Sequence, residues 1–542
     1  MKWTRFVFPV LLAVSLLSFI PSIGSGFVYD FLGWQKEYAQ GSFKDIINCF
    51  GYNGNHQFLH LVFYSFYQIF NIQGFPWYLL FCTLHAVNAF LLYKFILDFN
   101  QHWKTSIPEV LAVIGAMMFI IHPYNVEAVV WKVCVHYLLS MMAVLLVCIS
   151  FIRYMYGGEK KNLLTGIIVY AVSLFTLEIS FIMPLVISFA GVLIWALRDD
   201  KRIMVNRGIK FAGSLWALLG SYLVLNKFTL GAVVGHYGGN VHFQFDLLGI
   251  VSTEAKYLVK HFLFARFYSF KTKALLFDQI LSLPEIAFFF MTLVISVTLV
   301  YFIRIRKWKP NVHVMFFGFI TALLFILPVA NIYFYHLHIG MNDRYSYFPM
   351  AFLILALVAV FSKAPKWMSY GFFGIMIIIS LVLQQKTLKY WGQSTDVLQA
   401  LKREFRWHDA PYVFILNSPD NLKGIVMASI INEPSGMDEI FDYQTPRSYD
   451  GQMYDIFQYN MTSPNDGVHV EQTGPMQIKV ILNQWGNWWH RNGIGASNYE
   501  NEFYKAEMLD YPYQLTFKKF PPGSVIIYQD GGKWKEFKMT LN

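Results

Sequence analysis

Charged side chains in this chain of 542 residues gather at a few places between long apolar runs. The first is Asp30, which follows the first apolar run by several residues, in the stretch 26–34. A carboxylate held beside a reacting hydroxyl can take its proton, which is general-base chemistry. Asp30 is therefore the candidate catalytic residue, and a solvated loop acid is the structural alternative.

Other polar side chains stand where apolar runs end. Ionisable groups are costly at membrane depth, so such positions indicate functional sites. We predict that this set binds substrate and donor: His122, Glu127, Glu178, Arg344, Tyr345, Lys256, Lys260 and Arg266. Structural alternatives remain. Pro123 would end a helix with His122 as an interface anchor, Glu178 could be a turn residue, and Arg344 could pair with Asp343.

The sequence predicts no resident cofactor and leaves metal dependence open. His, Cys, Asp and Glu do not occur at metal-ligand spacing, and no nucleotide-binding glycine loop is evident. The cysteines form no disulfide framework, because Cys82, Cys134 and Cys148 lie in or beside apolar runs and Cys49 lies in a loop.

The composition predicts the elements that must position these groups. The chain is 56% hydrophobic and 14% charged, with a mean hydropathy of +0.41. A soluble domain would expose too much apolar surface at this composition, so we expect an α-helical polytopic membrane protein of about 11 transmembrane helices. The apolar runs of spanning length are residues 6–23, 77–97, 110–124, 133–152, 162–177, 180–197, 209–227, 280–303, 313–332, 347–362 and 367–384.

The net charge of +10 is unevenly distributed. Residues 1–384 carry 28 Lys and Arg against 15 Asp and Glu, whereas residues 385–542 carry 15 against 18. The positive-inside rule places the N-terminus and the basic alternate loops in the cytoplasm, and the C-terminus outside. Those loops are residues 94–104, 153–161, 198–210, 304–309 and 363–366. This distribution explains the basic excess without nucleic acid, which we do not expect as a partner.

Two further segments predict helices that lie along the membrane surface. Residues 58–72 are rich in aromatic side chains, and residues 253–275 mix basic and apolar side chains at helical spacing. In the second helix we expect the basic face to turn towards lipid phosphates, although it could also bind no ligand.

The composition changes at about residue 385, which divides the chain into a transmembrane domain, 1–384, and an extracytoplasmic soluble domain, 385–542. Residues 412–416, 478–482, 514–517 and 525–528 are typical of strands and are separated by turn signals. We predict a small α/β or mixed-sheet domain. Its aromatic stretch 485–490 could stack on sugar rings, but tryptophans in such domains are more often core.

Several of these segments resemble one known family. Residues 78–93 (YLLFCTLHAVNAFLLY), 122–131 (HPYNVEAVVW) and 343–349 (DRYSYFP) are similar to motifs of the transmembrane-and-TPR O-mannosyltransferases and their bacterial relatives. Weaker similarities are Leu177-Glu178 before Pro184, and residues 257–269. The order of the motifs matches over residues 20–385. TPR repeats are absent from the tail, and Cys134 to Tyr137 replace a family turn that carries an Arg and an acid.

This resemblance implies a GT-C-like glycosyltransferase that uses a polyprenyl-phosphate sugar with inversion. Its general base would be an acid in the first outer loop, which is Asp30 here. Arg344 is the first candidate to stabilise the leaving phosphate, followed by Lys256, Lys260 and Arg266, and the acceptor would be a hydroxyl of a protein, glycan or lipid. We expect the bacterial inner membrane with a periplasmic C-terminal domain, or the ER membrane in a eukaryote.

Other classes remain open from the sequence. A lipid-linked glycan transporter or flippase would place charges along a central pathway, and here they gather at one face. An O-antigen polymerase or ligase is normally built around a large outer loop. A non-catalytic protein whose outer domain binds a partner is the last alternative.

Overall fold

A computed structural model of the chain describes residues 4–48, 54–234, 246–330, 340, 342–427, 444–445, 447–483, 487–489, 497–509 and 512–540. Cys49, Trp485 and His490 lie outside the described residues. The chain forms two compact units. The first comprises Met1–Ile23, Gly41–Val130 and Cys134–Thr387, and the second comprises Gly24–Gln40, Trp131–Val133 and Leu388–Asn542.

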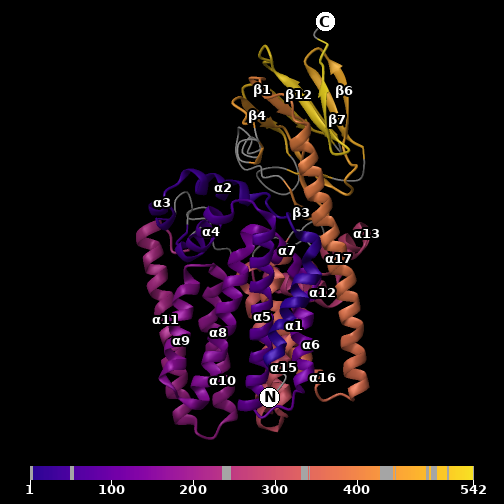
Figure 1. Ribbon diagram of the computed structural model, residues 1–542. Coiled ribbons are helices and arrows are strands. Elements are labelled where there is room, and N and C mark those ends of the chain that lie inside the picture. Colours follow the sequence, from indigo (N-terminus) through magenta and orange to yellow (C-terminus); the bar gives the residue numbers. More distant parts are fainter. Residues whose placement is uncertain are drawn as a thin grey trace. The chain divides into compact units, whose positions relative to one another are not determined.

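Helices form the first unit, and Figure 1 shows the long ones running roughly parallel or antiparallel to one another. The helices of the chain are α1 (Thr4–Phe19), α2 (Asp30–Gln40), α3 (Phe43–Ile47), α4 (Gln57–Phe70), α5 (Gly74–His102), α6 (Glu109–Ile121), α7 (Val126–Val130), α8 (Val135–Gly157), α9 (Lys160–Leu174), α10 (Met183–Leu197), α11 (Lys201–Leu230), α12 (Leu247–Leu263), α13 (Phe270–Lys273), α14 (Pro284–Ile303), α15 (Pro310–Ile326), α16 (Tyr347–Phe361) and α17 (Lys366–Glu404). Of these, α2 belongs to the second unit, and α17 continues from the first unit into it.

The predicted membrane spans coincide with helices. Among the described residues, nine helical segments are long and apolar enough to cross a membrane, or ten if the bent pair Glu109–Ile121 and Pro123–Val130 is one span. The predicted run 162–177 forms α9, which has only 15 residues and is short for a full crossing. The fold class is confirmed: the chain is a multi-pass integral membrane protein with a small β-rich C-terminal part.

Local sequence signals explain where helices begin and end. Pro284 and Pro310 occupy the first helical positions of α14 and α15, where proline costs no intrahelical hydrogen bond. Gly158 follows α8 with φ of 73°, the left-handed conformation that ends helices and suits glycine. Large apolar side chains such as Phe288 and Phe289 of α14 are exposed at 60% and 65%, as expected of a helix that faces lipid.

Close packing fixes α15 against α16. An added Cβ on Gly318 would lie 2.7 Å from the backbone oxygen of Phe352, so only glycine allows this approach. Small residues at helix contacts are the usual means of tight association in membranes. Along α16 nearly every side chain is buried, which holds its N-terminal end in a fixed place.

The two predicted surface helices have different outcomes. Residues 57–70 form α4, and its orientation in the membrane stays a prediction. The second prediction was wrong in two respects: α12 ends at Leu263, because Phe264 turns to a left-handed φ of 51°, and the basic face points inward. The side chains of Lys256, Lys260 and Arg266 are buried, which is costly unless polar groups pair with them.

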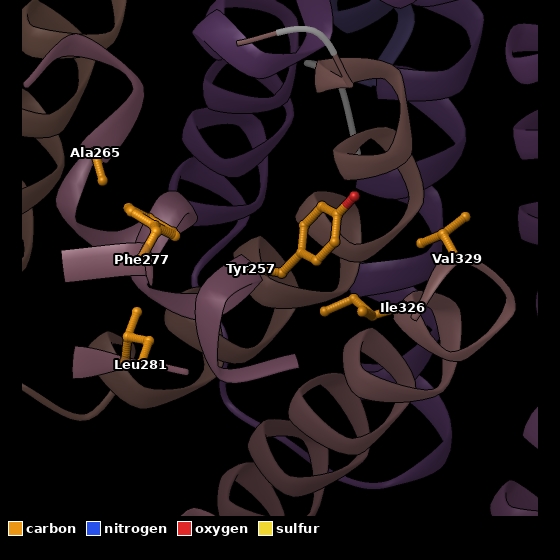
Figure 2. Packing of buried hydrophobic residues seen from close by; sticks show 6 residues of the cluster. All are labelled: Tyr257, Ala265, Phe277, Leu281, Ile326 and Val329. Atoms are coloured by element: carbon orange, nitrogen blue, oxygen red, sulfur yellow. The ribbon is translucent and has the colours of Figure 1, made fainter. Parts of the chain in front are cut away.

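Apolar packing holds this segment inside the first unit. A buried cluster joins α12 to the short elements that follow it, and to the end of α15, as Figure 2 shows. The cluster consists of Tyr257, Ala265, Phe277, Leu281, Ile326 and Val329. Tyr345 packs against its rim. These contacts place the basic residues of α12 beside the start of α16.

The C-terminal part contains three sheets of four, five and four strands. Their orders are β13-β12-β1-β4, β6-β7-β11-β10-β9 and β3-β2-β5-β8. The strands are β1 (Tyr412–Ile415), β2 (Ser418–Leu422), β3 (Ile425–Val426), β4 (Gln452–Asp455), β5 (Gln458–Met461), β6 (Val468–Gly474), β7 (Gln477–Leu482), β8 (Asn487–Trp489), β9 (Tyr499–Glu500), β10 (Tyr504–Met508), β11 (Tyr513–Phe517), β12 (Val525–Asp530) and β13 (Lys533–Phe537).

All four predicted strands are present, as β1, β7, β11 and β12. The central strand β1 runs parallel to β12 and β4, whereas β12 and β13 are antiparallel, so the first sheet is mixed. The tryptophan prediction holds for Trp488, which is buried against Tyr513 with ring centroids 4.9 Å apart.

Candidate functional site

A break in the chain after α6 brings Glu127 into the interior of the first unit. Pro123 follows His122, and the pair of segments Glu109–Ile121 and Pro123–Val130 is bent by 52°. Proline cannot continue a helix because it lacks an N–H and its ring clashes with the preceding turn. The side chain of Asn125 donates to the carbonyl of Phe119 at 2.6 Å, which satisfies the open end of α6.

Glu127 is buried at 4% exposure and is the acceptor for the segment that precedes α16. Its Oε2 accepts hydrogen bonds from the backbone N–H of Asp343 at 2.7 Å and of Arg344 at 3.2 Å. Its Oε1 accepts from Nη1 of Arg344 at 2.5 Å. A carboxylate that binds open N–H groups at the start of a helical turn is electrostatically favoured there.

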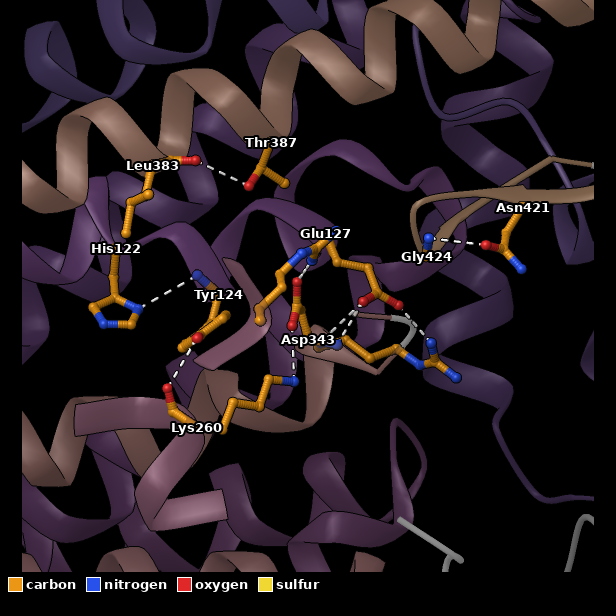
Figure 3. A network of polar contacts seen from close by, with 11 residues as sticks. His122, Tyr124, Glu127, Lys260, Asp343, Leu383, Thr387, Asn421 and Gly424 are labelled. Carbon is orange, nitrogen blue, oxygen red and sulfur yellow. Dashed lines mark hydrogen bonds and ion pairs between the residues drawn. The ribbon is translucent and has the colours of Figure 1, made fainter. Parts of the chain in front are cut away.

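Asp343 is the centre of a second, fully buried ion-pair group. Its Oδ1 lies 2.8 Å from Nζ of Lys260, and its Oδ2 pairs with the guanidinium of Arg266. The side chains of Asp343 and Lys260 are 0% exposed and that of Arg266 is 4% exposed. Figure 3 shows Lys260 reaching Asp343 beside Glu127. Arg344 thus pairs with Glu127, whereas Asp343 pairs with both Lys260 and Arg266.

Aromatic residues surround the Lys260 side of this network. The hydroxyl of Tyr124 donates to the carbonyl of Lys260 at 2.9 Å, and the Nζ of Lys260 lies 5.1 Å from the centre of the Tyr124 ring. The imidazole of His122 stacks on Phe264 with centroids 5.7 Å apart. His122 therefore lines the network. Its Nδ1 accepts a hydrogen bond from the backbone N–H of Tyr124 at 3.4 Å.

Arg344 and Tyr345 form the more open edge of the network. The Arg344 side chain is 19% exposed, and its guanidinium lies 4.7 Å above the ring of Tyr345. By formal charge, Lys260, Arg266 and Arg344 count as three cations and Glu127 and Asp343 as two anions, although burial and the neighbouring Arg266 lower the pKa of Lys260 well below its usual value. The formal surplus of one positive charge favours binding of an anion at the open edge of this described group.

Two other predicted site residues, Lys256 and Glu178, contact residues outside the ion-pair network. Nζ of Lys256 donates to the hydroxyl of Ser282 at 2.7 Å, and burial lowers the pKa of Lys256 while the charge of Asp278 acts in the opposite direction. Glu178 begins a 3-10 turn, Glu178–Ile182, and lies 2.8 Å from Nε2 of His56. Glu178 is thus a hydrogen-bond partner of His56 as well as a turn residue.

Asp30 belongs to the second unit, where it begins α2. It is half-buried, and the residue before it, Tyr29, has a positive φ of 58°. Such a backbone conformation is uncommon outside glycine and requires the surrounding structure to hold it.

Sequence reasoning missed the roles of Asp343 and His261. Asp343 was considered only as a partner of Arg344, because no local pattern links it to Lys260 and Arg266, which lie far earlier in the chain. His261 is buried between the rings of Tyr124 and Tyr257, at 5.9 Å and 6.0 Å. Burial and the charge of Lys260 lower the pKa of His261 well below its usual value.

Metal ligands are not grouped in the described part of the chain: no set of three or more His, Cys, Asp or Glu side chains there could hold an ion. The buried ion-pair network lies at the start of α16 in a multi-pass integral membrane protein.

No family model and no curated protein matches this chain. Among solved structures, the oligosaccharyltransferase AglB of Archaeoglobus fulgidus, in complex with an inhibitory peptide and a dolichol-phosphate, is similar at a TM-score of 0.38 and 12% identity, over 76% of this chain and 62% of that one. Its apo form gives a TM-score of 0.40 and 12% identity, over 77% and 62%. ArnT from Cupriavidus metallidurans, bound to undecaprenyl phosphate, gives a TM-score of 0.39 and 10% identity, over 85% and 93%.

The chain thus spans less than two thirds of the length of the oligosaccharyltransferase structures. All of these TM-scores are below 0.5. The likeness by itself therefore defines neither the fold nor the activity of this chain.

Proposed function

We propose that this chain is an integral-membrane glycosyltransferase. It moves a sugar from a polyprenyl-phosphate donor to an acceptor hydroxyl at the outer membrane face, with inversion. The observation that carries the proposal is the buried network of Lys260, Arg266 and Arg344 around two carboxylates. These residues lie in the segments whose sequences resemble the family motifs.

Arg344 suits the leaving phosphate for three reasons. It belongs to a group with a surplus positive charge, its side chain is 19% exposed, and its planar guanidinium can bind two oxygens of a phosphate at once. Lys260 and Arg266 are fully buried and held by Asp343, so they act by raising the local potential. Tyr345, stacked under the guanidinium, limits its orientations.

In the proposed reaction the acceptor hydroxyl gives its proton to the carboxylate of Asp30. The acceptor oxygen forms a bond to the anomeric carbon while the bond between that carbon and the phosphate oxygen breaks. The leaving polyprenyl phosphate keeps the electron pair, and inversion follows because attack and departure occur on opposite faces. A positioned base typically contributes 10²–10⁴-fold, and stabilisation of the developing phosphate charge is usually the larger effect.

The remaining predicted residues have supporting roles in this proposal. Glu127 holds Arg344 and the backbone before α16, and His122 lines the same network. Glu178 with His56, and Lys256 with Ser282, are further polar positions of the first unit that could contact sugar hydroxyls.

The test is transfer of labelled sugar from polyprenyl-phosphate donors in membranes that contain the wild type, Asp30→Asn or Arg344→Gln. We expect Asp30→Asn to abolish transfer with normal expression, and Arg344→Gln to lower kcat/KM for the donor. Glu159→Gln is the matched control, because its ion pair with Lys161 is exposed at 55% and 77%.

The alternatives predict different results. Transfer that survives in Asp30→Asn would remove Asp30 as the base. A folded wild type that transfers from no donor, but moves a lipid-linked glycan across vesicles, would establish a transporter instead. Transfer of a whole lipid-linked glycan chain, with no monosaccharide transfer, would indicate a polymerase or ligase.

A further inference from the structure

The segment that carries Asp30 belongs to the same compact unit as the C-terminal domain, which has no role in the proposed reaction. We infer that Gln444 of this domain is a positioning residue that holds the Asp30 segment in its working conformation. The inference rests on the proposed function of Asp30. Three consecutive backbone carbonyls just before Asp30 supply the evidence.

Each of these three carbonyls accepts a hydrogen bond from a residue distant in sequence. Gly26 O accepts from the backbone N–H of Lys132 at 3.0 Å, and Val28 O accepts from the indole Nε1 of Trp131 at 3.0 Å. Phe27 O, between them, accepts from Nε2 of Gln444 at 3.2 Å. The next residue is Tyr29, whose positive φ needs this kind of restraint.

Gln444 also reaches the helix that Asp30 begins. Its Nε2 donates to Oε1 of Gln35 at 3.1 Å, and Gln35 is 2% exposed. One amide group thus binds both the strained segment before Asp30 and the body of α2. Together these bonds fix the backbone at the start of α2, which sets the direction of the Cα–Cβ bond of Asp30.

The orientation of the Gln444 amide is determined by a third contact. Nζ of Lys402, near the end of α17, donates to its Oε1. An ammonium group can only donate, so the amide oxygen must face Lys402 and the NH₂ group must face Phe27 and Gln35. Gln444→Glu therefore keeps the lysine contact and loses both donated hydrogen bonds, which makes it a selective change.

The experiment measures kcat and donor KM in membranes for the wild type, Gln444→Glu and Gln444→Met. A displacement of about 1 Å in a catalytic group can cost 10²-fold, so we expect kcat to fall by about 10- to 100-fold. Donor KM should change by less than about twofold, because the cations assigned to the donor belong to the first unit. Gln514→Met is the control, since Gln514 donates to Gln477 at 3.3 Å in the same unit and should leave kcat unchanged.

A double-variant comparison separates positioning of Asp30 from general damage. If Gln444 acts through Asp30, Gln444→Glu should lower kcat by a smaller factor in the Asp30→Glu background, where the carboxylate is kept but already displaced, than in the wild type. Gln35→Met removes the acceptor of the second bond and should also lower kcat. This variant tests the inference if the Gln444 variants do not fold.

Two results would overturn the inference alone: an unchanged kcat in Gln444→Glu while Asp30→Asn is inactive, or a loss in the Asp30→Glu background equal to the loss in the wild type. Transfer that survives in Asp30→Asn would instead overturn the proposed function. The two failures are therefore distinguishable.

Discussion

Asp343→Asn tests whether the buried network is held together as the structure indicates. The substitution keeps the shape of the side chain and removes its charge. Lys260 at 0% exposure and Arg266 at 4% exposure would then lose the carboxylate that both contact. Removing one partner of a buried ion pair typically costs about 3–5 kcal/mol, because it leaves uncompensated buried charge. We expect a loss in this range.

The assay is reversible unfolding in mixed micelles with increasing SDS, followed by tryptophan fluorescence. Glu159→Gln is again the control, because exposed ion pairs contribute only about 0–1 kcal/mol. The double variant Asp343→Asn with Lys260→Met should recover part of the loss, since one of the stranded charges is then gone. Stability of Asp343→Asn equal to that of Glu159→Gln would refute the proposed buried pairing.

Two further predictions concern packing and pH. Gly318→Ala should lower the free energy of unfolding by about 1–3 kcal/mol, because its Cβ would lie 2.7 Å from the backbone oxygen of Phe352. The control Gly371→Ala has open space around it and should be neutral or stabilising in the same SDS titration. Burial raises the pKa of Asp420 in the C-terminal part to about 7, and the hydrogen bond from Asn421 acts in the opposite direction. The pKa of this carboxyl group in the unfolded state is near 3.8, so the folded state binds a proton there more tightly. Stability from this group is therefore present below about pH 4 and is lost as pH rises through about 7, by up to roughly 4 kcal/mol. Thermal unfolding between about pH 5 and 8 should show a fall in Tm that Asp420→Asn abolishes, and an identical pH dependence in both proteins would contradict it.

The sequence predicted those features that depend on local pattern. Apolar runs identified the helices because length and hydrophobicity suffice to define a membrane span, and strand-like runs between turn signals identified four strands, including Tyr412–Ile415. The direction of the basic face of α12 was mispredicted because a surface helix and a buried one share the same spacing of Lys256 and Lys260. Only the fold shows that Asp343, more than 80 residues further on, supplies the charge that allows the inward orientation.

The sequence also did not predict which distant residues contact the segment that carries Asp30, the candidate base. Asp30 lies near the first apolar run, which suggested that it belongs to the transmembrane domain. The compact unit that contains it is completed by residues 388–542 and by three residues after α7. No local signal marks Gln444 as a partner of Phe27, because a single glutamine in a polar stretch carries no pattern.

Because Arg344 and Lys260 have different surroundings in the network, their substitution should have different effects. Glu127 binds the backbone before α16 through Oε2 and the side chain of Arg344 through Oε1. If a phosphate drew the guanidinium away, both backbone hydrogen bonds could remain. Lys260 has no comparable freedom, because it is 0% exposed and pairs with a carboxylate that is also 0% exposed.

Arg344→Gln should therefore raise donor KM by about tenfold or more. Its loss of unfolding free energy should be smaller than that of Lys260→Met, which should act mainly on stability. The comparison needs both readouts on both variants: donor KM in membranes and the SDS midpoint in micelles. A large loss of stability in Arg344→Gln with an unchanged donor KM would mean that Arg344 is a structural ion-pair residue. In that case the surplus positive charge of the network would serve folding rather than phosphate binding.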